Sequence, residues 1–290
     1  MAVTAKMIKD LREKTGAGMS DCKNVLVEAN GDFERAQELL REKGLAKAEQ
    51  KSGRSASEGL ACIKIAENKK SGAIVEVNCE TDFVAKNEKF ANYVNDVTEH
   101  ALNSEADDLE DFLSMKWKNG NSSVKDELMQ QIAVIGENLI IRRFKKIKSD
   151  GCLISYIHGG GKIGVLLSLS CEYDEKINEV GKNVCMQIAA MSPKFISRDA
   201  VDKNFIEKEK SILMQQALNE GKNQEIAEKM VNGRLNKEFK EICLLDQVYV
   251  KDNDLSIEKY LNKMSKELGK DIKVSDFVRF SVGEEIEDKK

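Results

Sequence analysis

Apolar residues in the first 45 positions recur with the period of an α-helix, in three short blocks. Their apolar stripes are Met7, Ile8 and Leu11; Cys22, Val25 and Leu26; and Phe33, Ala36, Leu39 and Leu40. Thr4 and Asp32 stand where an N-cap is expected, and Gly16 and Gly44 stand where a helix would end. Residues 1–45 are therefore predicted to form a three-helix module of the ubiquitin-associated type, a small unit that commonly serves in docking.

The helical period is lost in residues 46–58, where lysine, glutamate, serine and glycine predominate. We interpret this stretch as a helix tail that runs into a flexible linker. Beyond it, short β-rich runs and longer amphipathic runs predict a first α+β subdomain over residues 59–148. Its predicted elements are strands at 60–66 and 73–79, helices at 88–103, 109–116 and 122–136, and a strand at 139–147.

A second α+β subdomain is predicted in two pieces, residues 149–198 and 245–283. Its predicted elements are strands at 152–158 and 163–171, a helix at 175–191, a helix at 256–268 and a strand at 272–282. The fold class is therefore α+β, with a core of two subdomains built on antiparallel sheets. The charged residues 284–290 are expected to form a frayed tail.

Residues 199–244 interrupt the second subdomain with two long helical patterns, which break at residues 220–222. Ile212 and Leu213 on the first helix are expected to face Ile226 and Met230 on the second. This pattern predicts a protruding helical hairpin of the coiled-coil kind. The hairpin could pair with a second copy, contact a partner or project into solvent, so a homodimer or a two-plus-two complex stays open.

Composition narrows the classes of function. The 46 basic and 50 acidic residues give a net charge of −4, which does not indicate nucleic-acid binding. No apolar run approaches the roughly 20 residues of a membrane span, and the N-terminus lacks the apolar segment of a secretion signal. Seven cysteines without a C-x-x-C pair suggest reduced thiols, no zinc site and a cytoplasmic location. The sequence predicts no cofactor and no metal.

Three clusters could carry chemistry. The glycine run 159–161 lacks the following helix of a phosphate-binding loop, so a hairpin turn is expected instead. The acids of residues 107–111 fit the first turn of a helix better than a metal site. Cys79 and His158 are the one notional nucleophile and base, and their spacing gives no support to an enzyme.

The most informative segment is residues 78–87, which leaves a predicted strand and enters a helix. Thr81 or Asp82 could cap a turn there, and Phe83 could fill the core. An aromatic ring beside a carboxylate on a rigid loop is also suited to inserting into the site of a partner protein. The residues alone leave both interpretations open.

Two stretches of the chain resemble the elongation factor Ts family: residues 11–19, which read LREKTGAGM, and residues 76–85, which read EVNCETDFVA. Supporting similarities occur in family order at residues 136–138, 142–143, 156–158, 188–190 and 226–231. Members of this family are guanine-nucleotide exchange factors for elongation factor Tu and are not enzymes in the usual sense. The resemblance implies an N-terminal module, a two-part α+β core and a projecting hairpin.

The resemblance also implies site residues. Asp82 and Phe83, flanked by Thr81 and Val84, would push between helices of the partner's GTPase domain and disturb its Mg²⁺ site. Partner-binding positions of the family match Arg12, Met19 and His158.

Two features depart from the family pattern. Ser20 stands where relatives often carry a second methionine, and the chain ends soon after residues 281–284, whereas some relatives continue into a further helix. The apolar contact at Ser20 is expected to be weakened or moved, and contacts made by such a further helix stay open. The remaining alternative is an adaptor that binds a partner without changing nucleotide release.

Overall fold

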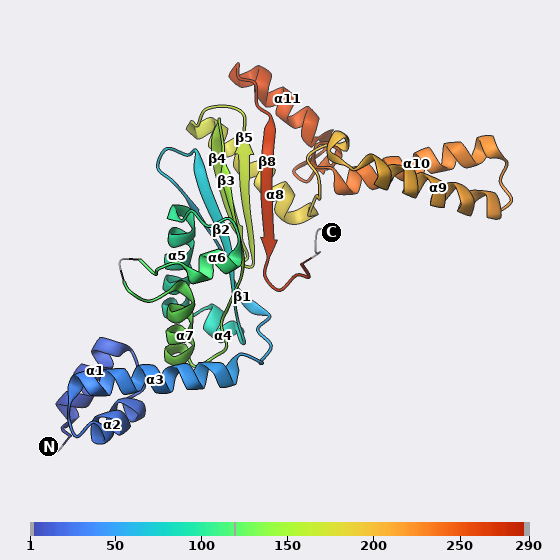
Figure 1. The fold of residues 1–290 in the computed structure, drawn as a ribbon. Coiled ribbons are helices and arrows are strands. Elements are labelled where there is room, and N and C mark those ends of the chain that lie inside the picture. Colours follow the sequence, from blue (N-terminus) through green and yellow to red (C-terminus); the bar gives the residue numbers. More distant parts are fainter. Residues whose placement is uncertain (1–2, 119, 287–290) are drawn as a thin grey trace.

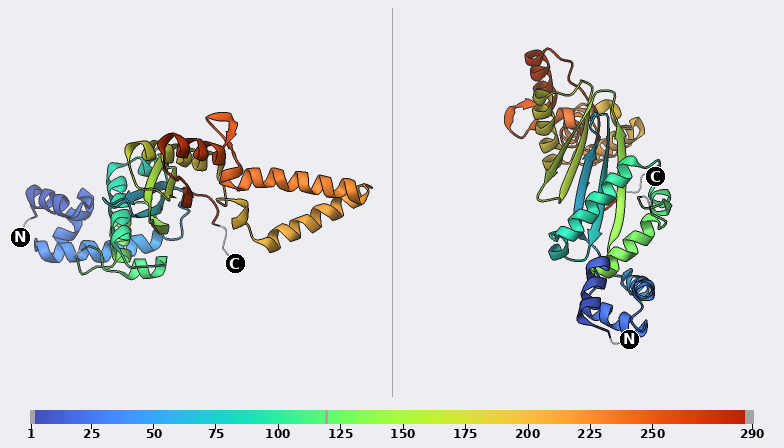
Figure 2. Two further views of the ribbon diagram at one scale, coloured as in Figure 1. Left: turned by 90° about the horizontal axis from the view of Figure 1, so that it is seen from above. Right: turned by 90° about the vertical axis from the view of Figure 1, so that its left-hand side faces the viewer.

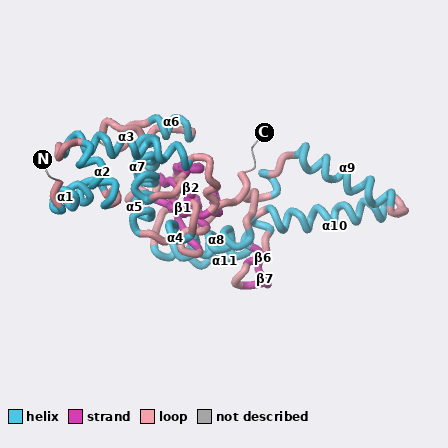
Figure 3. The backbone as a smooth tube through the Cα atoms, turned by 90° about the horizontal axis from the view of Figure 1, so that it is seen from below, coloured by secondary structure: helices cyan, strands magenta, loops and turns pink. Residues whose placement is uncertain are grey.

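The computed structural model describes residues 3–118 and 120–286. It confirms the α+β class: a helical unit at the N-terminal end, a core of sheets and helices, and a hairpin of two helices that projects from the core (Figures 1 and 2). Figure 3 shows most of the strands in the middle of the core with helices around them. The division into domains at the predicted residues, and the ubiquitin-associated and coiled-coil types, stay predictions.

The N-terminal unit consists of α1 (Ala5–Thr15), α2 (Met19–Glu28) and α3 (Phe33–Lys51). Both predicted N-caps are confirmed, because the side chain of Thr4 accepts a hydrogen bond from the Met7 N–H and that of Asp32 accepts one from the Arg35 N–H. The predicted stripes meet in a small core of Leu11, Cys22, Val25, Leu26, Ala36 and Leu39.

The predicted end of the third helix at Gly44 is wrong. Helix α3 continues to Lys51, so the first part of the predicted linker is helical. Gly44 is buried against α7 (Val124–Ile135), and a Cβ atom at that position would lie 3.0 Å from the Cβ of Ala133. This glycine therefore allows two helices to approach closely, and the approach keeps α3 helical where the sequence suggests a stop.

The first sheet has the order β1 (Glu58–Ile65), β2 (Ser71–Cys79) and β3 (Ile140–Lys148), all antiparallel. Helix α5 (Glu88–Asn103) packs on β1 and β2, and α6 (Leu109–Ser114) and α7 (Val124–Ile135) complete this side of the core. Phe90 and Phe112 are among the largest fully buried side chains here. Their apolar surface, which folding removes from water, stabilises this layer.

The second sheet has the order β4 (Cys152–His158), β5 (Ile163–Leu169) and β8 (Val274–Ser281), again antiparallel. Helices α8 (Glu175–Met191) and α11 (Ile257–Leu268) belong to its buried cluster. The structure adds a short ribbon that the sequence did not indicate, β6 (Val248–Tyr249) and β7 (Asp252–Ser256).

The two sheets pack on each other through their inner faces. Ala61 and Ile74 of the first sheet meet Phe280 of the second, and Ile147 meets Leu153 and Leu166. A Cβ atom at Gly164 would lie 3.1 Å from Ile74 Cδ1, so this glycine leaves room for the contact. The core therefore has its helices outside and its sheets inside.

The projecting hairpin consists of α9 (Lys203–Asn219) and α10 (Gln224–Ile242), and short helical turns η1 (Arg198–Ala200) and η2 (Leu244–Asp246) lie at its base. Arg198 and Asp246 form an ion pair of 2.7 Å there. The expected facing of Ile212 and Ile226 is wrong, since they are 40% and 46% exposed. Small side chains allow the close approach near the tip, and the buried positions are Ala217, Ala227, Val231 and Leu235.

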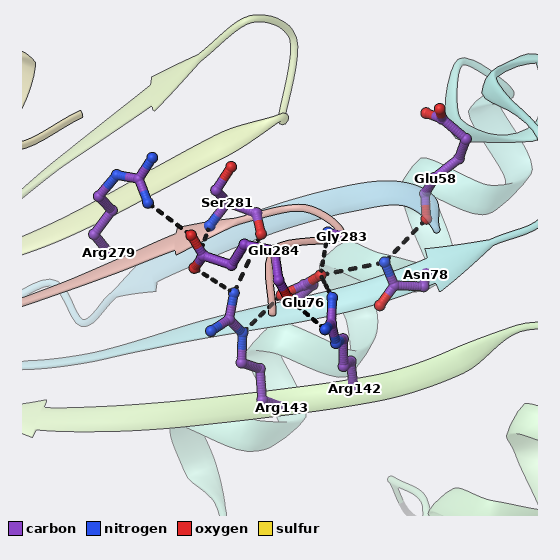
Figure 4. A network of polar contacts seen from close by, with 9 residues as sticks. All are labelled: Glu58, Glu76, Asn78, Arg142, Arg143, Arg279, Ser281, Gly283 and Glu284. Atoms are coloured by element: carbon purple, nitrogen blue, oxygen red, sulfur yellow. Dashed lines mark hydrogen bonds and ion pairs between the residues drawn. The ribbon is translucent and has the colours of Figure 1, made fainter. Parts of the chain in front are cut away.

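A buried carboxylate links the two sheets. Glu76 of β2 is fully buried and accepts hydrogen bonds from Arg143 Nε at 2.7 Å and from Gly283 N at 2.9 Å (Figure 4). Arg143 also pairs with Glu284 at 2.7 Å. Glu284, the first residue of the predicted charged tail, is therefore held by the core, because it pairs with two partly buried arginines, one from each sheet. The second of these is Arg279 of β8, at 2.8 Å.

Candidate functional site

The segment that follows β2 forms a single helical turn, α4 (Asp82–Ala85). Thr81 caps this turn: its hydroxyl oxygen accepts a hydrogen bond from the Val84 N–H at 3.3 Å. Ala85 is buried, whereas the ring of Phe83 is 82% exposed. The interpretation of Phe83 as a core residue is therefore wrong, and the capping role of Thr81 is confirmed.

Asp82 and Val84 flank the exposed ring. Asp82 Oδ2 accepts a hydrogen bond from Lys86 Nζ at 2.7 Å, and this bond holds the pKa of Asp82 below its usual range. The positive charge of Lys162 adds to the same effect. Val84 is partly buried against the core that β1, β2 and α5 form, and it anchors the turn. The turn thus presents one aromatic ring and one charged carboxylate on a packed base.

His158 ends β4 and is exposed. Its Nδ1 lies 3.0 Å from the hydroxyl of Tyr156. The β4–β5 turn that follows packs on β1, where the Ala61 N–H donates to the Gly161 carbonyl at 2.7 Å. Lys162 pairs with Glu58 in this region, and both charges act on the Asp82–Lys86 pair. The structure therefore brings the turn that carries His158 and the turn that carries Phe83 to the same end of the core.

Arg12 and Met19 lie elsewhere. Both are exposed, Arg12 on α1 and Met19 at the start of α2. Figure 1 shows α1 and α2 apart from α4, with α3 running from the helical unit toward the core. The structure does not join these residues to the Thr81–Val84 turn, so any common role would need a partner large enough to span both regions.

The notional pair of Cys79 and His158 is not a nucleophile and its base. Cys79 is fully buried, and its Sγ donates to the Thr81 carbonyl at 3.2 Å. Burial, together with the nearby charge of Glu137, raises the pKa of this thiol to about 12. A thiol in this state is protonated at neutral pH and is not a nucleophile.

The other two candidate clusters have the expected structural roles. Gly159, Gly160 and Gly161 all have positive φ and form the turn between β4 and β5. Asp108 caps α6 and accepts from the Asp111 N–H at 2.9 Å. Among residues 3–118 and 120–286, no group of histidine, cysteine and acidic side chains is arranged to hold a metal ion.

Sequence reasoning missed the contacts that hold the turn. The carboxylate of Glu137, which follows α7, accepts hydrogen bonds from the Glu80 and Thr81 N–H groups at 3.1 and 3.0 Å. Glu137 lies 56 residues from Thr81, and among the sequence signals only the family resemblance at residues 136–138 includes it. No local periodicity could have revealed this contact, because it depends on how β2 and β3 pair.

No helix in the described part of the chain is long and apolar enough to cross a membrane.

Comparison with known proteins gives the family. A family model described as "Elongation factor TS" matches residues 80–284, which include the exposed turn, β3 of the first sheet, the whole second sheet and the hairpin. The fold and this turn, taken with the match, place the chain in the class of translation elongation factors.

Curated relatives extend the match to nearly the full chain. "Elongation factor Ts" of Clostridium botulinum (strain ATCC 19397 / Type A) is 52% identical over 290 residues, covering 99% of this chain and 94% of that relative. "Elongation factor Ts" of Clostridium kluyveri (strain NBRC 12016) is 53% identical, with 99% and 95% covered. This chain belongs to the elongation factor Ts family, and the resemblance inferred from its sequence is confirmed.

Proposed function

We propose that this protein is a guanine-nucleotide exchange factor, which binds elongation factor Tu and promotes release of GDP during translation elongation in the cytoplasm. Family membership supports the activity and the partner. The observation that carries the proposal is the ring of Phe83, which is 82% exposed on a turn with a capped and packed base. Removing an apolar ring of this size from water is favourable in free energy, and the surface of a partner would bury the ring.

The proposed action is mechanical and needs no catalytic group of this chain. Phe83 and Asp82, supported by Thr81 and Val84, insert between helices of the partner's GTPase domain and shift the groups that hold its Mg²⁺. Mg²⁺ is held by few protein ligands and keeps several waters, so its site is sensitive to small displacements. GDP that is held through Mg²⁺ then dissociates more readily.

Magnitudes show that the ring does not act alone. A thousandfold acceleration of GDP release corresponds to lowering the barrier by about 4 kcal/mol. Burial of one phenylalanine contributes about 1.5–3 kcal/mol, and part of this offsets the ordering of the interface. We assign the remainder to a wider docking surface, to which Arg12, Met19 and His158 contribute.

Elongation factor Tu would bind the nucleotide at one site and this protein at another, and the coupling between these two binding events is reciprocal. If this protein weakens nucleotide binding, the nucleotide weakens binding of this protein by the same factor. Rebinding of GTP would therefore expel the exchange factor and complete the cycle. The stoichiometry of the complex, including a homodimer or a two-plus-two assembly, is open to measurement by light scattering of the mixture.

The test is the rate at which elongation factor Tu releases fluorescent GDP in stopped flow. We expect Phe83→Ala to slow the stimulated release by about tenfold or more, because the inserted ring is lost. Affinity for nucleotide-free elongation factor Tu, measured by calorimetry, should largely remain. Val250→Ala is the matched control, since Val250 is also an exposed apolar residue but lies on the β6–β7 ribbon, away from the turn.

An adaptor without exchange activity makes a different prediction. It would bind elongation factor Tu and leave the release of GDP unchanged at every concentration. That result would overturn the proposed function, and equal rates for Phe83→Ala and the parent would overturn the insertion mechanism.

A further inference from the structure

The Thr81–Val84 turn, which carries Phe83, is held by hydrogen bonds to one carboxylate outside the turn, that of Glu137. Glu137 Oε2 accepts from the Glu80 and Thr81 N–H groups, and its Oε1 accepts from the Thr81 hydroxyl at 2.6 Å. A carboxylate that accepts three hydrogen bonds from one short segment fixes that segment in both position and direction.

The hydroxyl of Thr81 connects the Glu137 carboxylate to the helical turn α4. It donates to Glu137, and its oxygen accepts from the Val84 N–H at 3.3 Å. The donation fixes the Thr81 rotamer, and that rotamer is the one that caps α4. A continuous chain of hydrogen bonds therefore runs from Glu137 through Thr81 to Val84, the residue next to Phe83.

The loop that carries Glu137 is itself fixed. Glu80 Oε1 accepts from the Asn138 N–H at 2.6 Å, so the two segments exchange carboxylate-to-backbone hydrogen bonds. The side chain of Asn138 is buried and donates to the Arg54 carbonyl at 2.8 Å, and Lys51 Nζ donates to the Gly136 carbonyl at 2.5 Å. Glu137 thus acts from a support that also holds the end of α3.

We propose that Glu137 is a positioning residue for nucleotide exchange: it sets the direction in which the Thr81–Val84 turn presents Phe83 to the partner. This inference rests on the proposed function. Val84 and Ala85 anchor the base of the turn, but the hydrogen bonds within so short a helix do not by themselves fix the direction of the ring. Insertion depends on the direction in which the ring points. A loosened turn therefore lowers the rate of GDP release even when the ring is present.

The test separates the maximal rate of GDP release at saturating exchange factor from the concentration that gives half of that rate. We expect Glu137→Ala to lower the maximal rate by about tenfold and to change the half-saturating concentration by less than about twofold. Glu137→Gln should recover much of the rate, because its amide oxygen still accepts from the backbone N–H groups. Hydrogen exchange of the Glu80 and Thr81 amides should be faster in Glu137→Ala than in the parent.

Asp126→Ala is the matched control. Asp126 lies at the other end of α7, and its carboxylate accepts from the Ser123 N–H at 2.9 Å in a capping box. Its removal also takes away a carboxylate that binds a backbone N–H, but at a place remote from the turn. We expect this variant to lose some thermal stability and to keep the parent's maximal rate.

The double variant Phe83→Ala with Glu137→Ala distinguishes the two proposals. If Glu137 acts through the ring, the double variant releases GDP as slowly as Phe83→Ala alone. Two outcomes would overturn the positioning role and leave the proposed function intact. In the first, the double variant is slowed by the product of both single effects. In the second, Glu137→Ala releases GDP at the parent's rate while Phe83→Ala is slow. A Phe83→Ala rate equal to the parent's overturns the insertion mechanism, and the positioning role with it.

Thr81→Val is the alternative test if Glu137→Ala does not fold. It removes only the hydroxyl that links Glu137 to the Val84 N–H, and we expect a lower maximal rate again. A Thr81→Val protein with the parent's maximal rate would then overturn the inference.

Discussion

At the scale of single residues, the end of β2 shows how burial assigns different roles to neighbours. Cys79 is fully buried and Ala85 is nearly so, whereas Phe83 between them is exposed. A turn of four residues is too short to show a helical period, so the order of apolar and polar residues does not reveal which side chain points outward. The sequence allowed both interpretations of Phe83, and the packing of α4 on the core decided between them.

Cys79 gives a prediction at this scale. Its pKa of about 12 leaves roughly one thiol in ten thousand as thiolate at pH 8, and burial blocks access as well. We expect brief treatment of the native protein with iodoacetamide at pH 8 to leave Cys79 unmodified, as shown by peptide mass spectrometry. The same treatment in denaturant should modify it fully, which serves as the control. Rapid alkylation of Cys79 in the native protein would contradict the structure.

At the scale of elements, sequence patterns predicted the positions of most helices and strands, but the helix end that they predicted at Gly44 is wrong. Thr4 and Asp32 were recognised as caps because capping is a local hydrogen bond within one turn. The sequence predicts a helix end at Gly44, because glycine is costly inside a helix. Only the contact between α3 and α7 explains its presence, and that contact joins residues far apart in the sequence.

Gly44→Val tests this explanation. Its Cβ would already lie 3.0 Å from the Cβ of Ala133, and two further methyl groups would force α3 from α7. We expect the free energy of unfolding to fall by about 1–3 kcal/mol, as is typical of overpacking, and proteolysis at residues 52–57 to accelerate. Urea denaturation and limited proteolysis measure the two effects.

Gly233→Val is the control for that change. Gly233 lies within α10, and a Cβ atom there would have no neighbour within 4 Å. Since valine is a better helix former than glycine, this variant should be at least as stable as the parent. Equal destabilisation by both substitutions would contradict the explanation by a specific contact between α3 and α7.

At the scale of the whole molecule, a network of buried and partly buried charges holds the two sheets in one arrangement. Glu76 in β2 binds Arg143 in β3 and the backbone of Gly283, beyond β8. Glu284 binds Arg143 and Arg279, one from each sheet. Such a network is destabilised when one member is removed, because the buried Glu76 and the partly buried groups around it then lose a partner.

This network predicts a dependence of stability on pH. Burial by itself would raise the pKa of Glu284, but the hydrogen bonds from Ser281 N and Arg143 and the charges of Arg143 and Arg279 outweigh it, so the pKa is lowered from its ordinary 4.5. A carboxyl group with a lowered pKa in the folded state stabilises that state above pH 4.5 and loses this contribution as the pH falls through the lowered value.

We therefore expect Glu284→Gln to be less stable than the parent at neutral pH. Below pH 4.5 the two stabilities should converge, because the parent loses the contribution that the variant never had. Urea denaturation over a series of pH values measures both curves. Parallel curves down to the most acidic pH would show that Glu284 does not contribute in this way.

The sequence by itself determined the α+β class, most element positions, the caps and the turn at the glycine run, and its two resembling stretches indicated the family. These features depend on periods, caps and turns that involve residues a few positions apart. The tertiary structure alone decided that the two sheets face each other, that α3 continues past Gly44, that Glu284 belongs to the core and that Glu137 holds the Thr81–Val84 turn. Each of these depends on groups that are distant in sequence, and their approach is set by the packing of the whole chain.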